Sequence, residues 1–112
     1  MALVVREVGQ TLENSLRPSD HIGRWMENEF LAVLPECGGD EVVRVGERLK
    51  RAVKQHKVDW WGDKMEISVS MGATHARTND GPKSILHRGE RGLREAVRQG
   101  RDCLVVWDEL EF

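Results

Sequence analysis

The sequence is poor in cysteine and has no long apolar run, and each shortage excludes a class of protein. Its 112 residues include two cysteines, Cys37 and Cys103. They form no CxxC pair and have no histidine close by, so a structural metal site is not expected. We expect both to be free thiols in a reducing cytoplasm. No apolar run approaches the ~20 residues that a membrane helix needs, and the N-terminus lacks the pattern of a signal peptide.

An excess of positive charge is also missing. Lysine and arginine together number 17 against 19 aspartates and glutamates, which gives a net charge of -2. This balance argues against general binding of nucleic acid. The four histidines are scattered without the spacing of metal ligands, so surface or capping roles are expected for His21, His56, His75 and His87. The length indicates a single domain over residues 1–112, with an acidic tail at 107–112.

The most informative stretch runs from Arg17 to Pro35. Pro18 disfavours helical geometry at the residue before it, so a preceding helix is expected to stop there. Two short runs typical of strands follow at 21–25 and 30–34, separated by the four residues MENE. Such a spacing predicts a β-hairpin.

The periodicity of apolar residues predicts the other elements. Helices are expected at 3–16, at 42–57 and from Pro82 to a C-cap at Gly100. Alternation predicts a strand at 65–73, and a last buried strand is expected at 103–106. Residues 58–63 form a strand or turn, in which Trp60 and Trp61 are expected to cover an edge of the core, with a dimer contact as the alternative.

At this point the residues resemble a known family. The motif RxxD at Arg17 and Asp20, a five-residue gap, and the later Glu29-Phe30 before an apolar strand resemble the signature hairpin of GGDEF domains. These are the bacterial diguanylate cyclases, which make cyclic di-GMP. The run SVSMG at 68–72 resembles the family's "vSiG" strand, and residues 89–102 resemble its last helix, "ADxALYxAKxxGRN".

The resemblance implies an α+β fold, a ferredoxin-like sheet of the nucleotide-cyclase type with helices packed on it. It covers residues 3 to 106 and only the later part of a full GGDEF domain, so the match is truncated at the N-terminus. The family's first strand and helix belong upstream, and that strand lies between the segments FLAVL (30–34) and SVSMG (68–72). We therefore expect these two segments to pair directly, or a second chain to fill the space.

The catalytic signature is degenerate. Its five positions are Met26, Glu27, Asn28, Glu29 and Phe30. Asn28 stands where the family has a carboxylate, and it can neither carry charge nor act as a base. The family's phosphate-binding lysine is Val97, although Arg101 remains as a remnant of that site. We therefore expect no catalytic residue, no metal ligand and no cofactor, with Mg²⁺ relevant only if the domain is active.

A second copy of the signature letters, GGDEV at 38–42, is a decoy. It follows the predicted hairpin and opens a helix. We expect Gly38 and Gly39 to make the turn, while Asp40 and Glu41 place negative charge at the helix N-terminus.

The residues of the family's inhibitory-type site are retained more completely than those of its catalytic signature. The resemblance implies that Arg17 and Asp20, with Arg48 on the next helix, bind cyclic di-GMP. A guanidinium can fork onto guanine or phosphate, and a carboxylate accepts from guanine N–H groups. The alternative is that Arg17 and Asp20 form only a local ion pair, which contributes little to stability.

Three functions remain open. The leading one is a non-catalytic, cytoplasmic bacterial signalling domain that binds cyclic di-GMP, as a homodimer or beside other signalling domains. The others are an active diguanylate cyclase and a structural or dimerisation module without a ligand. A contact with nucleic acid or a membrane span is not expected.

Overall fold

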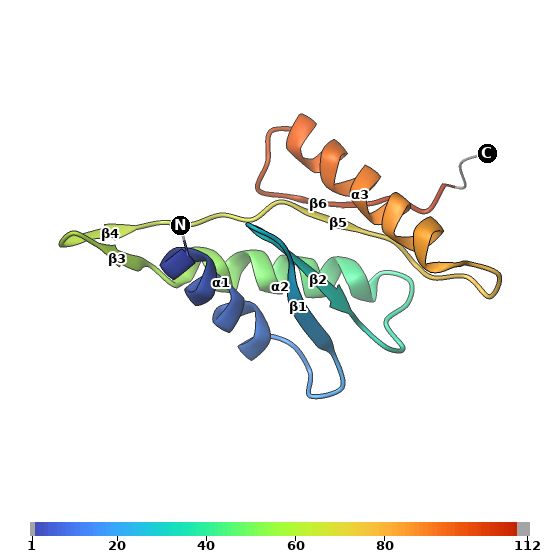
Figure 1. Cartoon of the computed structure of the whole chain (residues 1–112), viewed down its shortest axis with the longest axis horizontal. Coiled ribbons are helices and arrows are strands. Elements are labelled where there is room, and N and C mark those ends of the chain that lie inside the picture. Colours follow the sequence, from blue (N-terminus) through green and yellow to red (C-terminus); the bar gives the residue numbers. More distant parts are fainter. Residues whose placement is uncertain (1, 110–112) are drawn as a thin grey trace.

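The computed structural model describes residues 2–109, and the side chains from residue 7 onward except that of Trp60. The end of the acidic tail at 110–112 therefore lies outside the described residues, as do the side chains of Val4 and Val5. The elements in chain order are α1 (Ala2–Asn14), β1 (His21–Met26), β2 (Glu29–Val33), α2 (Glu41–Gln55), β3 (Val58–Trp60), β4 (Asp63–Met65), β5 (Met71–Ala73), α3 (Pro82–Arg98) and β6 (Leu104–Val106). Helices α1 and α2 lie on one side of the strands and α3 on the other (Figure 1).

The core forms between α1 and α2. Val8 and Leu12 of α1 meet Leu49 and Val53 of α2, and all four are buried. These positions follow the helical period, so the amphipathic spacing places them on facing sides. The mixed α/β class and the three helices are as the sequence predicts, with boundaries that differ by about two residues.

Helix α2 begins at Glu41, within the decoy motif. The amide of Glu41 donates to the carbonyl of Gly38 at 3.1 Å. Gly39 adopts a left-handed backbone with φ of +54°, which glycine tolerates without steric cost. The interpretation of these glycines as a turn before a helix is confirmed.

The β1–β2 hairpin is tighter than the sequence predicts. Met26 pairs with Glu29, so the connection has two residues, Glu27 and Asn28, instead of the expected four. A bulge between Arg24 and Met26 absorbs the difference at Trp25. Neither connecting residue is among the positive-φ residues of the described chain. This turn therefore does not need the glycines of the family signature.

Within residues 2–109 the strands form three separate two-stranded sheets, β1–β2, β3–β4 and the parallel pair β5–β6. The expected direct pairing of 30–34 with 68–72 is therefore wrong. The expected strand at 65–73 is also too long, because only residues 71–73 pair, with β6. The backbone of β5 is fixed to α3: a Cβ on Gly72 would lie 2.1 Å from the amide nitrogen of Leu93. Moving β5 toward β2 would break this contact.

The β3–β4 hairpin projects from one end of the molecule (Figure 1). Trp61 lies in its turn, at a left-handed φ of 52°, and is 87% exposed. The expectation that Trp61 covers a core edge is wrong, because the turn carries it beyond the helices. None of the three helices within residues 2–109 has the length and apolarity of a membrane-spanning segment.

Candidate functional site

The RxxD residues close a turn after α1. The backbone amide of Arg17 donates to Oδ2 of Asp20 at 2.9 Å, and its Nη2 donates to Oδ1, also at 2.9 Å. The same Nη2 donates to the carbonyl of Pro35 at 2.7 Å, which ties this turn to the end of β2. The side chain of Arg17 is 40% exposed and that of Asp20 only 1%. Arg17 therefore covers its own partner.

The third predicted ligand, Arg48, reaches the same place from α2. Its Nε donates to the carbonyl of Ser15, just past the end of α1, at 3.1 Å. Hydrogen bonds from Arg17, followed by the nearby charges of Arg17 and Arg48, lower the pKa of Asp20. The hydrogen bond to Asp20 raises the pKa of Arg17 in turn. The structure thus brings Arg17, Asp20 and Arg48 to one place at the end of α1.

A shallow hollow of about 580 Å³ lies along the exposed face of α2 beside this cluster. It is lined by Val43, Arg44, Glu47, Arg48, Arg51, Ala52 and Gln55. Three of these residues are arginines, so the hollow is suited to an anionic group. Arg44 and Arg51 were not among the predicted ligands, although their spacing from Arg48 along a helix is visible in the sequence.

Cys37 lies between the hairpin and α2, near the cluster. Burial and the neighbouring carboxylate of Glu41 raise the pKa of its thiol. A raised pKa disfavours the thiolate, so this cysteine is not an activated nucleophile. Cys37 and Cys103 are both free thiols.

The signature residues make a different kind of surface. Met26, Glu27 and Asn28 are exposed, and Arg24 donates to the carbonyl of Glu27. Phe30 points inward, where its ring packs against Gly9 of α1. Phe30 therefore serves the core rather than a ligand.

The hairpin turn carries Asn28 where the family signature has a carboxylate. Asn28 carries no charge, and no group of three or more His, Cys, Asp or Glu residues able to hold a metal ion is found in the described part of the chain. The remnant Arg101 lies in the turn between α3 and β6, with φ of +68°. Within residues 2–109, no hydrogen bond or ion pair joins it to the hairpin turn.

A buried polar cluster that was not predicted from the sequence lies beyond β5. Arg88 of α3 is only 2% exposed. Its Nε donates to Oγ1 of Thr74 at 2.9 Å and its Nη2 to the carbonyl of His75 at 3.0 Å. Its two Nη atoms also donate to both oxygens of Asp80. The basic character of the last helix would suggest a solvated face, but Arg88 is buried and paired.

The cluster also holds the segment after β6. Asp108 accepts from Oγ1 of Thr74 at 3.0 Å and from the amide of His75 at 2.8 Å, and its Oδ2 lies 2.8 Å from Nδ1 of His75. Burial opposes ionisation of Asp108, but these hydrogen bonds outweigh it and its pKa is lowered. His75 thus has a structural role, whereas His21, His56 and His87 are exposed.

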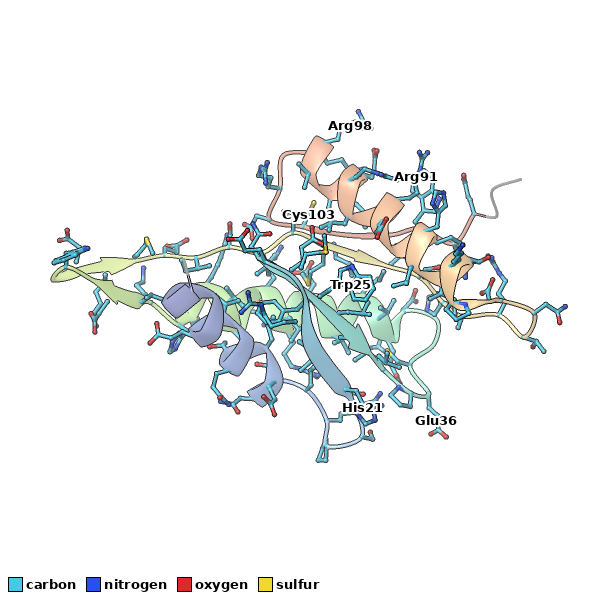
Figure 2. All side chains as sticks on the ribbon, viewed as in Figure 1. His21, Trp25, Glu36, Arg91, Arg98 and Cys103 are labelled. Atoms are coloured by element: carbon cyan, nitrogen blue, oxygen red, sulfur yellow. The ribbon has the colours of Figure 1, made fainter. Side chains whose placement is uncertain are left out.

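The remaining arginines of α3 are exposed. Arg91 and Arg98 project from α3 on the side away from the hairpin (Figure 2). Arg91 lies over the ring of Trp107, 5.0 Å from its centroid, and Arg98 pairs with Glu95 on the same helix. On this face of α3, Arg91 and Arg98 thus interact with neighbouring side chains of the same chain.

Comparison with known proteins identifies the fold and the family together. The profile described as "Diguanylate cyclase, GGDEF domain" matches residues 3–103. The chain therefore belongs to the GGDEF family. The diguanylate cyclase DosC of Escherichia coli K12 is 28% identical over 105 residues, which make up 93% of this chain and 23% of DosC. The chain thus spans less than a third of this curated relative.

Two solved structures show the same fold. The diguanylate cyclase SiaD of Pseudomonas aeruginosa, in complex with its activator SiaC, has a TM-score of 0.88 at 30% identity, over 93% of this chain and 40% of SiaD. The GGDEF domain of DgcB from Caulobacter crescentus, in complex with c-di-GMP, has a TM-score of 0.86 at 20% identity. That match covers 93% of this chain and 63% of the DgcB chain.

Proposed function

We propose that this chain is a non-catalytic GGDEF domain that binds cyclic di-GMP through Arg17, Asp20 and Arg48. It acts in the cytoplasm of a bacterium, as a signalling module rather than as a source of the nucleotide. The observation that carries the proposal is the meeting of Arg17 and Arg48 at the end of α1. Two guanidinium groups from separate elements at one exposed place favour an anionic, planar ligand.

The arrangement indicates how the ligand is received. Arg17 is the exposed member of the pair and Asp20 the covered one. A guanine base or phosphate first meets Arg17 and Arg48. When Arg17 turns toward the ligand, it uncovers the carboxylate of Asp20, which then accepts from the guanine N–H groups. Arg44 and Arg51 extend the positive surface along α2.

The absence of turnover is proposed on separate grounds. Joining two GTP molecules needs a metal to neutralise the phosphates and a group to activate the attacking hydroxyl. The hairpin turn offers Asn28 in place of a carboxylate, and Glu27 adds negative charge beside any triphosphate. Val97 replaces the family's phosphate-binding lysine.

The test is calorimetric titration of cyclic di-GMP into the 112-residue chain, beside the variants Arg17→Ala and Arg48→Ala. We expect micromolar or tighter binding that each variant weakens about tenfold or more, the cost of a lost charge-assisted hydrogen bond. The matched control is Arg94→Ala, which removes one exposed positive charge from α3 and should leave the affinity unchanged. Equal weakening by all three variants would indicate only non-specific attraction.

The turn that Arg17 and Asp20 close favours a second candidate function, a structural or assembly module without a ligand. The carboxylate of Asp20 is already satisfied by Arg17, which is what a purely structural ion pair requires. If no heat accompanies titration of any protein, RxxD is a structural turn and the domain is an assembly module. Incubation with GTP and Mg²⁺ tests the third function, since product formed by the wild-type chain would make it an active cyclase.

A further inference from the structure

The tip of the β3–β4 hairpin holds a tryptophan in a strained conformation. Trp60 pairs with Asp63, so the connection between the strands consists of Trp61 and Gly62. Both have a positive φ, 52° and 89°, as in a type I′ turn, whose first position favours asparagine, aspartate or glycine. A bulky side chain is rarely found at such a φ. Backbone strain of this kind points to a function for the side chain that causes it.

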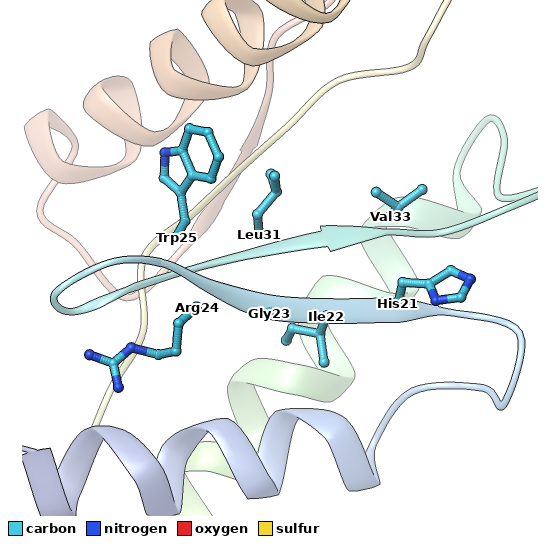
Figure 3. Close-up of a pocket in the computed structure, with 7 residues that line it drawn as sticks. All are labelled: His21, Ile22, Gly23, Arg24, Trp25, Leu31 and Val33. Carbon is cyan, nitrogen blue, oxygen red and sulfur yellow. The ribbon is translucent and has the colours of Figure 1, made fainter.

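The same tryptophan is presented to solvent. Trp61 is 87% exposed, and its hairpin projects beyond the end of α2, from which two residues separate it (Figure 1). Trp25 differs, since it lies in β1 on the same face as Leu31 and Val33 (Figure 3) and is 46% exposed. An exposed tryptophan at the end of a projection is typical of a residue that anchors a protein interface.

The hairpin is also stiffened along its length. Val58, at its base, is buried. Two ion pairs connect its two sides, one from Lys57 Nζ to Glu66 at 3.4 Å and one from Lys64 Nζ to Asp59 at 2.6 Å. A tip that is already held in place loses little conformational freedom on binding, which favours association.

The charge that remains at the tip is negative. Asp63 directly follows the turn and is exposed. Its carboxylate makes no ion pair and accepts no hydrogen bond within residues 2–109. The tip thus combines one large aromatic ring with one unpaired carboxylate. A surface that offers both cations and apolar contact is complementary to it.

Such a surface lies on α2 of the same chain, in the hollow of about 580 Å³ along its exposed face. Its apolar part includes Val43, which is 44% exposed. The side chains of Arg44 and Arg51 make no ion pair or hydrogen bond in the described part of the chain. The one carboxylate of the lining, on Glu47, is paired with Lys50 at 3.3 Å. Guanidinium planes stack on indole rings and pair with carboxylates, so the hollow offers both contacts that the tip needs.

We propose that two copies of this chain associate by placing the tip of each β3–β4 hairpin in the α2 hollow of the other. The indole of Trp61 covers Val43 and stacks on the guanidinium groups of Arg44 and Arg51, while Asp63 pairs with one of them. Because the hairpin continues past the end of α2, two antiparallel copies bring each tip alongside the other's helix. This pairing uses the same two surfaces twice and is closed by a two-fold axis.

The expected association is weak. Each tryptophan buries about 150–250 Å², so the two tips and the surfaces they cover form an interface smaller than the ~1,200–2,000 Å² of a stable complex. We therefore expect a dissociation constant in the micromolar range. The proposal does not rest on cyclic di-GMP, since Arg17, Asp20 and Arg48 are unchanged in every variant below and no nucleotide is added.

The test is sedimentation velocity of the 112-residue chain over a series of micromolar concentrations. Trp61→Asn removes the ring and places in the turn a residue that type I′ geometry favours, so the variant should fold, which circular dichroism checks. We expect its dissociation constant to rise at least about tenfold. The matched control Trp25→Asn removes a tryptophan from the β1–β2 hairpin and should leave the association unchanged.

A mixing experiment tests which surface the tip meets. The double variant Arg44→Glu, Arg51→Glu reverses the charge of the hollow and should also be monomeric. Mixed with Trp61→Asn, it should associate again, because its intact tip meets the intact hollow of the other protein. The mixture should therefore sediment faster than either variant alone.

Four results would overturn the proposal. They are a wild-type chain that stays monomeric throughout the series, association that Trp61→Asn leaves unchanged, an equal loss in Trp25→Asn, and a mixture that sediments no faster than its components. The first would show that the tip does not bind a second copy, and the last that it does not meet the α2 hollow.

Discussion

The guanidinium of Arg88 donates to both carboxylate oxygens of Asp80, with Nη1 2.9 Å from Oδ1 and Nη2 2.6 Å from Oδ2. Both side chains are buried, at 3% and 7% exposed. A two-pronged pair of this geometry is among the stronger polar contacts in proteins. It fixes the loop after β5 to the second turn of α3.

Loss of Arg88 should destabilise the fold severely. Arg88→Leu leaves the carboxylate of Asp80 buried without its cation and removes the donors to Thr74 and His75. Breaking a buried pair in this way costs about 3–5 kcal/mol of the free energy of unfolding. Urea denaturation measures it. The control Arg94→Leu, on the same helix but exposed, should change stability by less than about 0.5 kcal/mol, and equal effects of the two would show that the buried pair contributes nothing.

Acid should weaken the same pair. The two donors of Arg88, followed by the amide of Arg77, lower the pKa of Asp80 from 3.8 to about 2. The folded state thus binds this proton less tightly than the unfolded state. The stabilisation is therefore fully present above about pH 4 and is lost as the pH falls toward about 2.

The urea midpoint measured across this pH window checks the direction. Asp20 and Glu95 also have lowered pKa values, so the wild-type chain should lose stability steeply on acidification. Asp80→Asn should show a shallower loss, because one of the coupled carboxylates is gone. An unchanged slope would mean that Asp80 titrates alike in the folded and unfolded states.

Two glycines of α3 should respond to alanine with opposite signs. A Cβ on Gly92 would lie 2.8 Å from the carbonyl oxygen of Val105 and 3.1 Å from Cα of Gly72, both backbone atoms. Gly92→Ala should therefore destabilise the chain by about 1–3 kcal/mol through overpacking. A Cβ on Gly89 would meet nothing within 4 Å, so Gly89→Ala should gain up to about 1 kcal/mol of helix propensity.

Thermal unfolding of the two alanine variants gives the comparison directly. A gain for both would show that α3 and β5 can move apart without cost, which the close backbone approach between Gly92 and Gly72 does not allow.

The helices were predictable because each carries its own amphipathic pattern, as α2 does from Val45 through Leu49 to Val53. The turn at Gly38 and Gly39 was predictable for a related reason, since its chemistry is local. Burial of Arg88 was harder to foresee. It lies on the apolar stripe between Ile85 and Gly92, but its partner Asp80 comes from the preceding loop, and only the folded chain shows that the two meet.

The extent of the strands could not be predicted from local pattern. Residues 66–70 alternate like a strand, yet a strand needs a neighbour that accepts its hydrogen bonds. The described chain offers β6 as a neighbour to residues 71–73 only. The convergence of Arg17, Asp20 and Arg48 was expected from the family resemblance alone, because nothing in the local sequence relates α2 to the end of α1.

Restoring the signature should not restore chemistry. The triple variant Met26→Gly, Glu27→Gly, Asn28→Asp recreates the family's letters in the hairpin turn. We expect it to form no cyclic di-GMP from GTP and Mg²⁺, because one new carboxylate does not complete a metal site and Val97 still replaces the lysine. The glycines should also loosen a turn that now uses ordinary backbone angles. Chromatography of the reaction mixture gives the answer, with DosC as the positive control. Product from the triple variant would show that the hairpin turn alone had silenced an otherwise competent site.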